Sequence, residues 1–106
     1  MQLDRQFSRR ELLTIAANRY YFGDNVIGVQ EAAQHYFSKT PNELTVGEAA
    51  LLAGLVRAPS YFSPSRHHDR ALQRRNQVIE GMLASHAITS AEADAALAAP
   101  LNITGN

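Results

Sequence analysis

The sequence predicts an all-α protein, and three observations support that prediction. Helix-start signals recur along the chain, the stretches that follow them place apolar residues at helical spacing, and no stretch alternates apolar and polar residues as a half-buried strand does. We therefore expect five or six short-to-medium helices and no sheet, in a single unit that covers residues 1–106.

The helix-start signals are capping boxes, in which a hydroxyl residue is followed three positions later by glutamate. The hydroxyl accepts a hydrogen bond from the glutamate N–H, and the glutamate side chain accepts one from the N–H of the hydroxyl residue. Each cap is worth about 0.5–2 kcal/mol. The four boxes pair Ser8 with Glu11, Thr40 with Glu43, Thr45 with Glu48, and Thr89 with Glu92.

Five helices follow from these boxes and from the apolar spacing. The sequence predicts them at about 9–18, after Gly28, at 46–56, at 68–86 and at 90–98. The segment 46–56 is apolar nearly all round, so it should be buried on most sides and form the central helix. Two prolines make 57–64 a loop.

The composition argues against several kinds of partner and site. Ten basic and ten acidic residues cancel, so the charge gives no reason to expect a nucleic-acid partner. The absence of cysteine excludes disulfides and thiolate metal sites. No apolar stretch reaches the roughly 18 residues of a membrane span, so we expect any membrane anchor to lie outside this chain.

Few residues suggest chemistry by themselves. The four histidines lack a carboxylate at ligand spacing, so no metal site is predicted. Four of the glutamates belong to capping boxes, which leaves Glu31 and Glu80, and both are expected on solvated helix faces. The helix that carries Glu80 also carries Arg70, Arg74 and Arg75, so a solvated face is the default reading for Glu80. The sequence therefore predicts no catalytic residue here.

Several stretches, taken in order, resemble one family. They are Phe7–Leu13, Ala17–Gly23, Gly28–Lys39, Glu48–Leu55 and Arg74–Ile79. This series resembles the second half of the transglycosylase domain of glycosyltransferase family 51, which occurs in class A penicillin-binding proteins and monofunctional peptidoglycan glycosyltransferases. The resemblance implies the C-terminal part of a lysozyme-like transglycosylase fold.

Two family motifs can be placed residue by residue. The K-x-x-I-L-x-x-Y-L-N motif resembles the stretch from Arg9 to Asn18 and departs from it at positions 16 and 17, where alanines replace Tyr and Leu. The R-x-x-x-V-L motif resembles the stretch that contains Arg74 and Val78. The resemblance implies that Arg9 and Asn18 lie near the substrate cleft, and that Arg74 and Val78 belong to the scaffold. The residues alone equally allow Arg9 to be solvated and Asn18 simply to end its helix, and they favour a structural ion pair for Arg74.

The family motifs that carry catalysis have no counterpart in these 106 residues. They are E-D-x-x-F-x-x-H-x-G, G-x-S-T-x-x-Q-Q and R-K-x-x-E. By resemblance, the family polymerises lipid II into glycan strands, which requires a general base and stabilisation of the departing pyrophosphate by cations or a divalent metal. We therefore expect the catalytic glutamates and any metal ligands outside this chain, no cofactor within it, and no activity from the chain alone.

The resemblance also implies partners and a location. Lipid II and the growing glycan strand are the expected partners, at the outer face of the cytoplasmic membrane in the bacterial cell envelope. Segments outside this chain are expected to reach the membrane. Because the helix at 46–56 needs neighbours on every side and some could be missing from a half domain, we also expect exposed apolar surface and self-association.

Two alternatives from other classes remain at this point. The stretch 44–55 is also typical of the first helix and turn of a helix-turn-helix DNA-binding protein, although the two prolines that follow oppose a recognition helix. A non-catalytic helical interaction module, the remnant of a decayed transglycosylase gene, is the other alternative.

Overall fold

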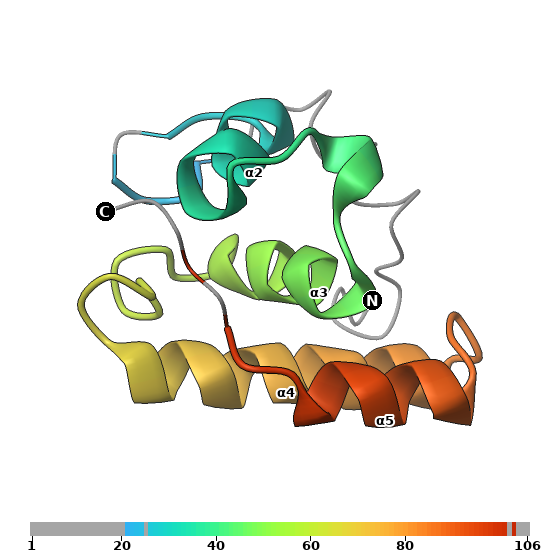
Figure 1. Cartoon of the computed structure of the whole chain (residues 1–106). Coiled ribbons are helices and arrows are strands. Elements are labelled where there is room, and N and C mark those ends of the chain that lie inside the picture. Colours follow the sequence, from blue (N-terminus) through green and yellow to red (C-terminus); the bar gives the residue numbers. More distant parts are fainter. Residues whose placement is uncertain (1–20, 25, 102, 104–106) are drawn as a thin grey trace.

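The computed structural model describes residues 21–24, 26–101 and 103. Within them it contains four α-helices and one 3₁₀ turn (Figure 1): α2 (Val29–Phe37), η2 (Pro41–Glu43), α3 (Val46–Leu55), α4 (His68–Ala84) and α5 (Ser90–Ala98). The all-α prediction is confirmed, although the described part has four helices where five or six were expected. The helix expected at 9–18 lies outside the described residues. The β structure of this part is an isolated bridge between Tyr21 and Ile27.

Helix α3 lies at the centre of the molecule. In Figure 1 it runs between α2 on one side and the pair α4 and α5 on the other, and it packs most extensively on α4. Every residue from Ala49 to Leu55 is buried. The prediction of a central helix is therefore confirmed, and its neighbours come from the described chain itself. Self-association stays a prediction.

Helix α2 covers α3 with one apolar face. The predicted stripe is buried, from Val29 at the start of the helix to Tyr36 and Phe37 at its end. The helix stops at Ser38, whose backbone is left-handed with φ 57°. The Ser38 and Lys39 N–H groups donate to carbonyls of the last turn, at 3.0 and 3.2 Å. This stop turns the chain back so that Lys39 lies beside the start of α3.

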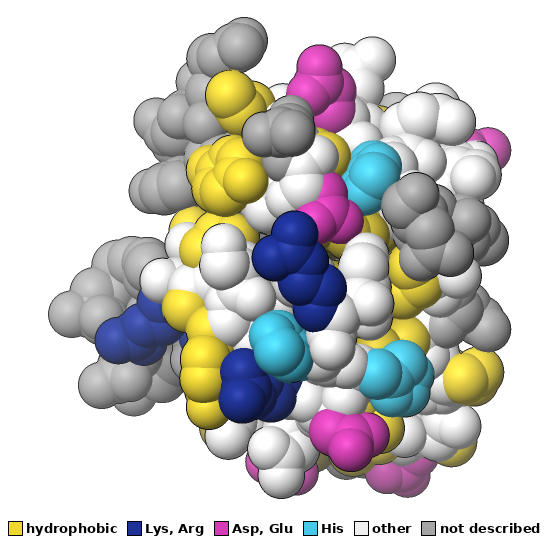
Figure 2. Space-filling model, turned by 90° about the vertical axis from the view of Figure 1, so that its left-hand side faces the viewer, with side chains coloured by type: hydrophobic (Ala, Val, Ile, Leu, Met, Phe, Trp, Pro, Cys, Tyr) yellow, Lys and Arg dark blue, Asp and Glu magenta, His cyan; other side chains and the backbone are white. Residues whose placement is uncertain are grey.

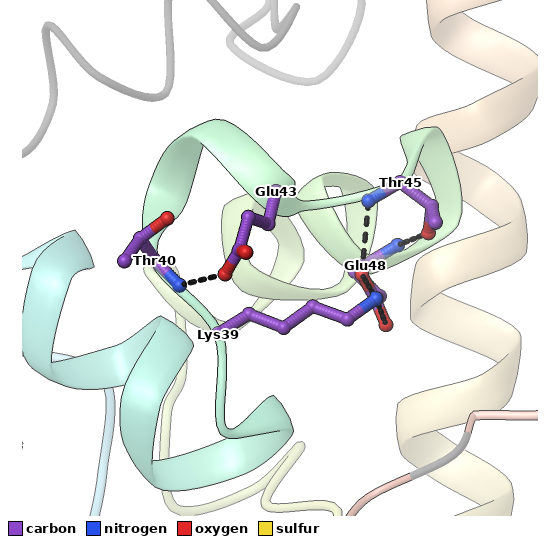
Figure 3. Close-up of polar contacts among 5 residues, drawn as sticks. All are labelled: Lys39, Thr40, Glu43, Thr45 and Glu48. Atoms are coloured by element: carbon purple, nitrogen blue, oxygen red, sulfur yellow. Dashed lines mark hydrogen bonds and ion pairs between the residues drawn. The ribbon is translucent and has the colours of Figure 1, made fainter.

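The capping boxes form where the structure describes them. In the box that starts α3, the Thr45 N–H donates to Glu48 Oε1 at 2.9 Å, and the Glu48 N–H donates to Thr45 Oγ1 at 3.2 Å (Figure 3). The same pair of bonds starts α5 at Thr89. The box at Thr40 starts only the short 3₁₀ turn η2. The box at Ser8 lies outside the described residues.

The tight contact between α3 and α4 depends on a glycine. A Cβ atom at Gly54 would lie 2.7 Å from Cγ of Arg74, which is closer than packed atoms can approach. The Arg74 Nε also donates to the Gly54 carbonyl at 3.3 Å, so the arginine cannot easily move aside. Gly54 therefore sets the distance between the two helices.

We predict that Gly54→Ala destabilises the chain. Overpacking against Arg74 should lower the free energy of unfolding by about 1–3 kcal/mol relative to Gly47→Ala in the same helix. A Cβ at Gly47 meets nothing closer than 3.7 Å, so that control gains helix propensity without a clash. Urea unfolding measures both variants, and equal stabilities would contradict this account of the helix contact.

We also predict that the Glu43 carboxyl titrates below the ordinary glutamate range of about 4.3. The hydrogen bond from the Thr40 N–H, followed by the one from the Thr40 hydroxyl, lowers the pKa of Glu43. Since the folded pKa is lowered, this interaction is fully present above the ordinary pKa and is lost as the pH falls through the lowered one. NMR titration should show Thr40→Val raising the Glu43 pKa part of the way back. An unchanged pKa would argue against the hydroxyl bond.

Candidate functional site

The sequence-predicted site residues fall into two groups. Arg9 and Asn18 lie outside the described residues. Arg74 and Val78 lie on the face of α4 that packs against α3, where Arg74 is buried and Val78 is completely buried. The Arg74 head donates to the Gly54 carbonyl and to Gln77 Oε1, at 3.3 and 3.4 Å, and lies 5.6 Å from the Phe62 ring. These contacts join α4 to the end of α3 and to the loop that follows.

The solvated face expected for Glu80 is confirmed, but the arginines on the same helix differ in burial. Arg70 and Glu80 are exposed, but Arg75 is only 2% exposed and Arg74 is 7% exposed. Both belong to the buried stripe of α4, which has the i, i+3, i+4, i+7 spacing of a helix face: Ala71, Arg74, Arg75, Val78, Ile79 and Met82. Sequence reasoning listed only the apolar residues of this face and did not place the two arginines between them.

Arg75 is a buried cation that holds the end of α5. Its Nη1 donates to the Ala99 carbonyl at 2.8 Å and to the Pro100 carbonyl at 3.4 Å, while Nη2 donates to the Leu97 carbonyl at 3.4 Å. The remaining N–H groups bind Asn76 Oδ1. Carbonyls at a helix C-terminus lack helical partners and carry partial negative charge, so they balance the buried guanidinium. Burial lowers the pKa of Arg75 from its high ordinary value.

A second polar contact, partly buried, joins the end of α2 to the start of α3. Lys39 Nζ lies 2.9 Å from both carboxylate oxygens of Glu48, whose Oε1 also accepts from the Thr45 N–H (Figure 3). The Glu48 side chain is 12% exposed. Sequence reasoning gave Glu48 its capping role and missed Lys39. This carboxylate already accepts three hydrogen bonds, so it acts as a structural anchor and is poorly placed to accept a proton from a substrate.

These two contacts border one pocket. It has a volume of about 370 Å³, and its lining includes Lys39, Glu48 and Arg75 together with apolar residues such as Leu51 and Leu101. The charged groups in this lining are already bound to one another or to backbone N–H and carbonyl groups. The pocket can therefore accept an apolar group, and its lining offers no activated nucleophile.

A third polar cluster gathers around Asp24. Its Oδ2 lies 3.2 Å from His35 Nε2 on α2 and accepts from the Ser65 hydroxyl, also at 3.2 Å. Both partners bind the same carboxylate oxygen, so the arrangement differs from a Ser–His–Asp relay, in which histidine lies between the other two groups. The cluster ties the turn at Gly23 and Asp24 to α2 and to the loop that precedes α4.

The buried side chain of Tyr36 stabilises the turn at Gly23 and Asp24. Its hydroxyl donates to the Phe22 carbonyl at 2.8 Å. Burial, followed by the nearby Asp24 charge, raises the pKa of Tyr36 well above its ordinary value, so the hydroxyl stays protonated and keeps donating. Sequence reasoning assigned Tyr36 to the core and missed the polar role of its hydroxyl.

No group of three histidine, aspartate or glutamate side chains in the described part of the chain could hold a metal ion. The described helices also include none that is long and apolar enough to cross a membrane.

A family model, related sequences and a solved structure all match this chain and agree with one another. A family model described as "Transglycosylase" matches residues 1–83. Penicillin-binding protein 1A of Aquifex aeolicus is 40% identical over 97% of this chain, and that of Vibrio cholerae is 44% identical over 95% of it. The crystal structure of penicillin-binding protein 1A from Haemophilus influenzae matches 98% of the chain with a TM-score of 0.83 at 38% identity. The chain spans 14%, 12% and 16% of these three relatives.

We predict that Arg75→Met destabilises the chain strongly. Methionine fills a similar volume but leaves the carbonyls at the end of α5 without donors, which should lower the free energy of unfolding by about 2–4 kcal/mol. Arg70→Met on the same helix removes an exposed arginine, whose ring contact is worth about 0.5–1 kcal/mol. Urea unfolding compares the two variants. If both lose the same small amount, Arg75 does not hold α5.

Proposed function

This chain belongs to the transglycosylase family, glycosyltransferase family 51, and on that premise we propose that it forms the C-terminal half of a domain that polymerises lipid II into peptidoglycan glycan strands. The observation that carries the proposal is the match of its helical body to penicillin-binding protein 1A, with a TM-score of 0.83 at 38% identity. At this identity the likeness extends beyond the arrangement of helices to the sequence.

Within that domain, we assign the described residues a structural role. The family reaction joins a sugar hydroxyl to the anomeric carbon of the donor, while a base takes the hydroxyl proton and the pyrophosphate leaves. The polar groups of this chain are engaged in holding helices: Glu48 binds Lys39, Arg75 binds the end of α5, and Asp24 binds two segments. This supports a division of labour in which the family's glutamate motifs supply the base and this half provides a rigid wall behind the cleft.

The proposed partners follow from the same assignment. Lipid II and the growing strand would meet the domain at the outer face of the cytoplasmic membrane, in the bacterial cell envelope. Any membrane-spanning anchor would lie in segments outside this chain. Arg9 and Asn18 are proposed to lie near the substrate because of the motif that they share with the family.

The helix-turn-helix alternative is not favoured. In that motif a short turn leads from the first helix directly into the recognition helix. Here residues 56–67 separate α3 from α4, and they form turns around the two prolines. The next helix, α4, uses its apolar stripe to pack against α3.

We predict that this chain can replace its counterpart in a relative. In penicillin-binding protein 1A of Vibrio cholerae, exchange of the matching segment, which is 44% identical to this chain, should leave lipid II polymerisation within about tenfold of the parent. The chain alone should polymerise none. Glycan chains resolved on a gel measure both outcomes.

The matched control is binding of labelled penicillin by the same chimera, because it reports folding independently of polymerisation. A chimera that binds penicillin and makes no glycan would contradict the proposal and favour a non-catalytic interaction module. Glycan synthesis by the isolated chain would instead contradict the proposed division of labour.

A further inference from the structure

The exposed arginines of the described part of the chain all lie in one stretch. It comprises the loop between α3 and α4 together with the first residues of α4, residues 57–70, and it contains one acidic residue, Asp69. We call this surface the arginine face. Its basic members are Arg57, Arg66, His67, His68 and Arg70.

Elsewhere in the described residues the balance is acidic. Arg74 and Arg75 are buried, and Lys39 is bound to Glu48. Most of the remaining carboxylates are exposed: Glu31, Glu43, Glu80, Glu92 and Asp94. The whole chain has no net charge, but its charge is unevenly distributed. The arginine face is positive, and the rest of the described surface is negative.

Figure 2 views the molecule from the side on which the loop between α3 and α4 lies in Figure 1. Arginine or lysine and histidine side chains gather on this side, with a few acidic side chains among them. One carboxylate at its edge is that of Asp24, which Ser65 of the same loop and His35 already bind. With Asp69 it makes two carboxylates against three exposed arginines, so positive charge stays in excess.

An exposed aromatic residue accompanies the positive charge. Tyr61 is 54% exposed, and the Arg70 guanidinium lies 4.1 Å from the centre of its ring. The Phe62 ring packs edge-on behind Tyr61, with 5.0 Å between ring centres, and fixes its position. An amphipathic ring beside a cation is the combination that stabilises proteins at the boundary between lipid headgroups and water.

The arrangement also indicates the shape of the partner. A site for one small anion encloses it with converging, largely desolvated donors. Here Arg57, Arg66 and Arg70 are all exposed and are spread along a loop and a helix start. Charges presented in this way match an extended anionic surface, to which each arginine contributes independently.

We propose that the arginine face docks on an anionic phospholipid surface. Arg57, Arg66 and Arg70 would lie near headgroup phosphates, and the Tyr61 ring would lie at the level of the headgroups. This contact goes beyond the proposed polymerisation of lipid II, since it concerns how the domain is held against its membrane. Each arginine should contribute about fivefold to the affinity.

The test uses the 106-residue chain and two kinds of vesicle, of phosphatidylcholine alone and of phosphatidylcholine mixed with phosphatidylglycerol. Flotation should show binding to the mixed vesicles only, and this binding should weaken as added salt shortens the range of the attraction. Replacing all three arginines by glutamine should weaken binding at least tenfold. Tyr61→Ser should weaken it separately.

The matched control separates the arginine face from overall charge. Arg66→Gln and Lys39→Gln each remove one positive charge, but only the first lies on the arginine face. The proposal requires Arg66→Gln to weaken vesicle binding about fivefold and Lys39→Gln to change it less than twofold. Circular dichroism confirms that each variant is folded.

Three results would overturn the proposal. One is equal loss of binding in Arg66→Gln and Lys39→Gln, which would indicate attraction by net charge alone. Another is displacement from vesicles by low millimolar inorganic pyrophosphate, which would indicate a pocket for a small anion. The third is duplex DNA binding as tight as vesicle binding at the same salt. Polymerisation by the chimera is measured independently, so failure of either proposal leaves the other standing.

Discussion

The structure depends on one constraint: most of α3 has no polar face that could be exposed to solvent. Between Ala49 and Leu55 the helix is apolar or glycine at every position, so it is stable only when neighbours enclose it. Helices α2, α4 and α5 supply that enclosure (Figure 1). Each of them has one apolar face and one face that remains in solvent.

Apolar contacts have little directional preference, so they do not by themselves fix the orientation of the helices packed around α3. Polar contacts near both ends of α3 fix it. Lys39 reaches Glu48 at the start of α3, while Arg74 crosses Gly54 near its end and donates to the carbonyl there. Arg75, beside Arg74, fixes α5 through the carbonyls at its end. Unsatisfied buried charges cost several kcal/mol, so these contacts select one packing arrangement over alternatives with equal apolar burial.

The same contacts bear on the proposed structural role of the described residues. The buried charged groups bind other parts of the chain, and the exposed arginines of the described residues lie on the loop between α3 and α4 and the start of α4. A rigid body of this kind can hold a cleft wall and orient a domain at a membrane. The chemistry of glycan transfer would then rest on residues that present unpaired carboxylates to the substrate.

The sequence by itself determined the helices and the family. The bounds of α5 were predicted to the residue, those of α3 and α4 to within about two residues, and the start of α2 after Gly28, because capping boxes and apolar spacing are local signals. Only the tertiary structure decided which charges are buried. Arg75 and Arg70 look alike in the sequence, yet one holds the end of α5 and the other lies in solvent. The difference arises because the carbonyl acceptors of Arg75 lie more than twenty residues away, at positions that only the packing of α5 against α4 brings within reach.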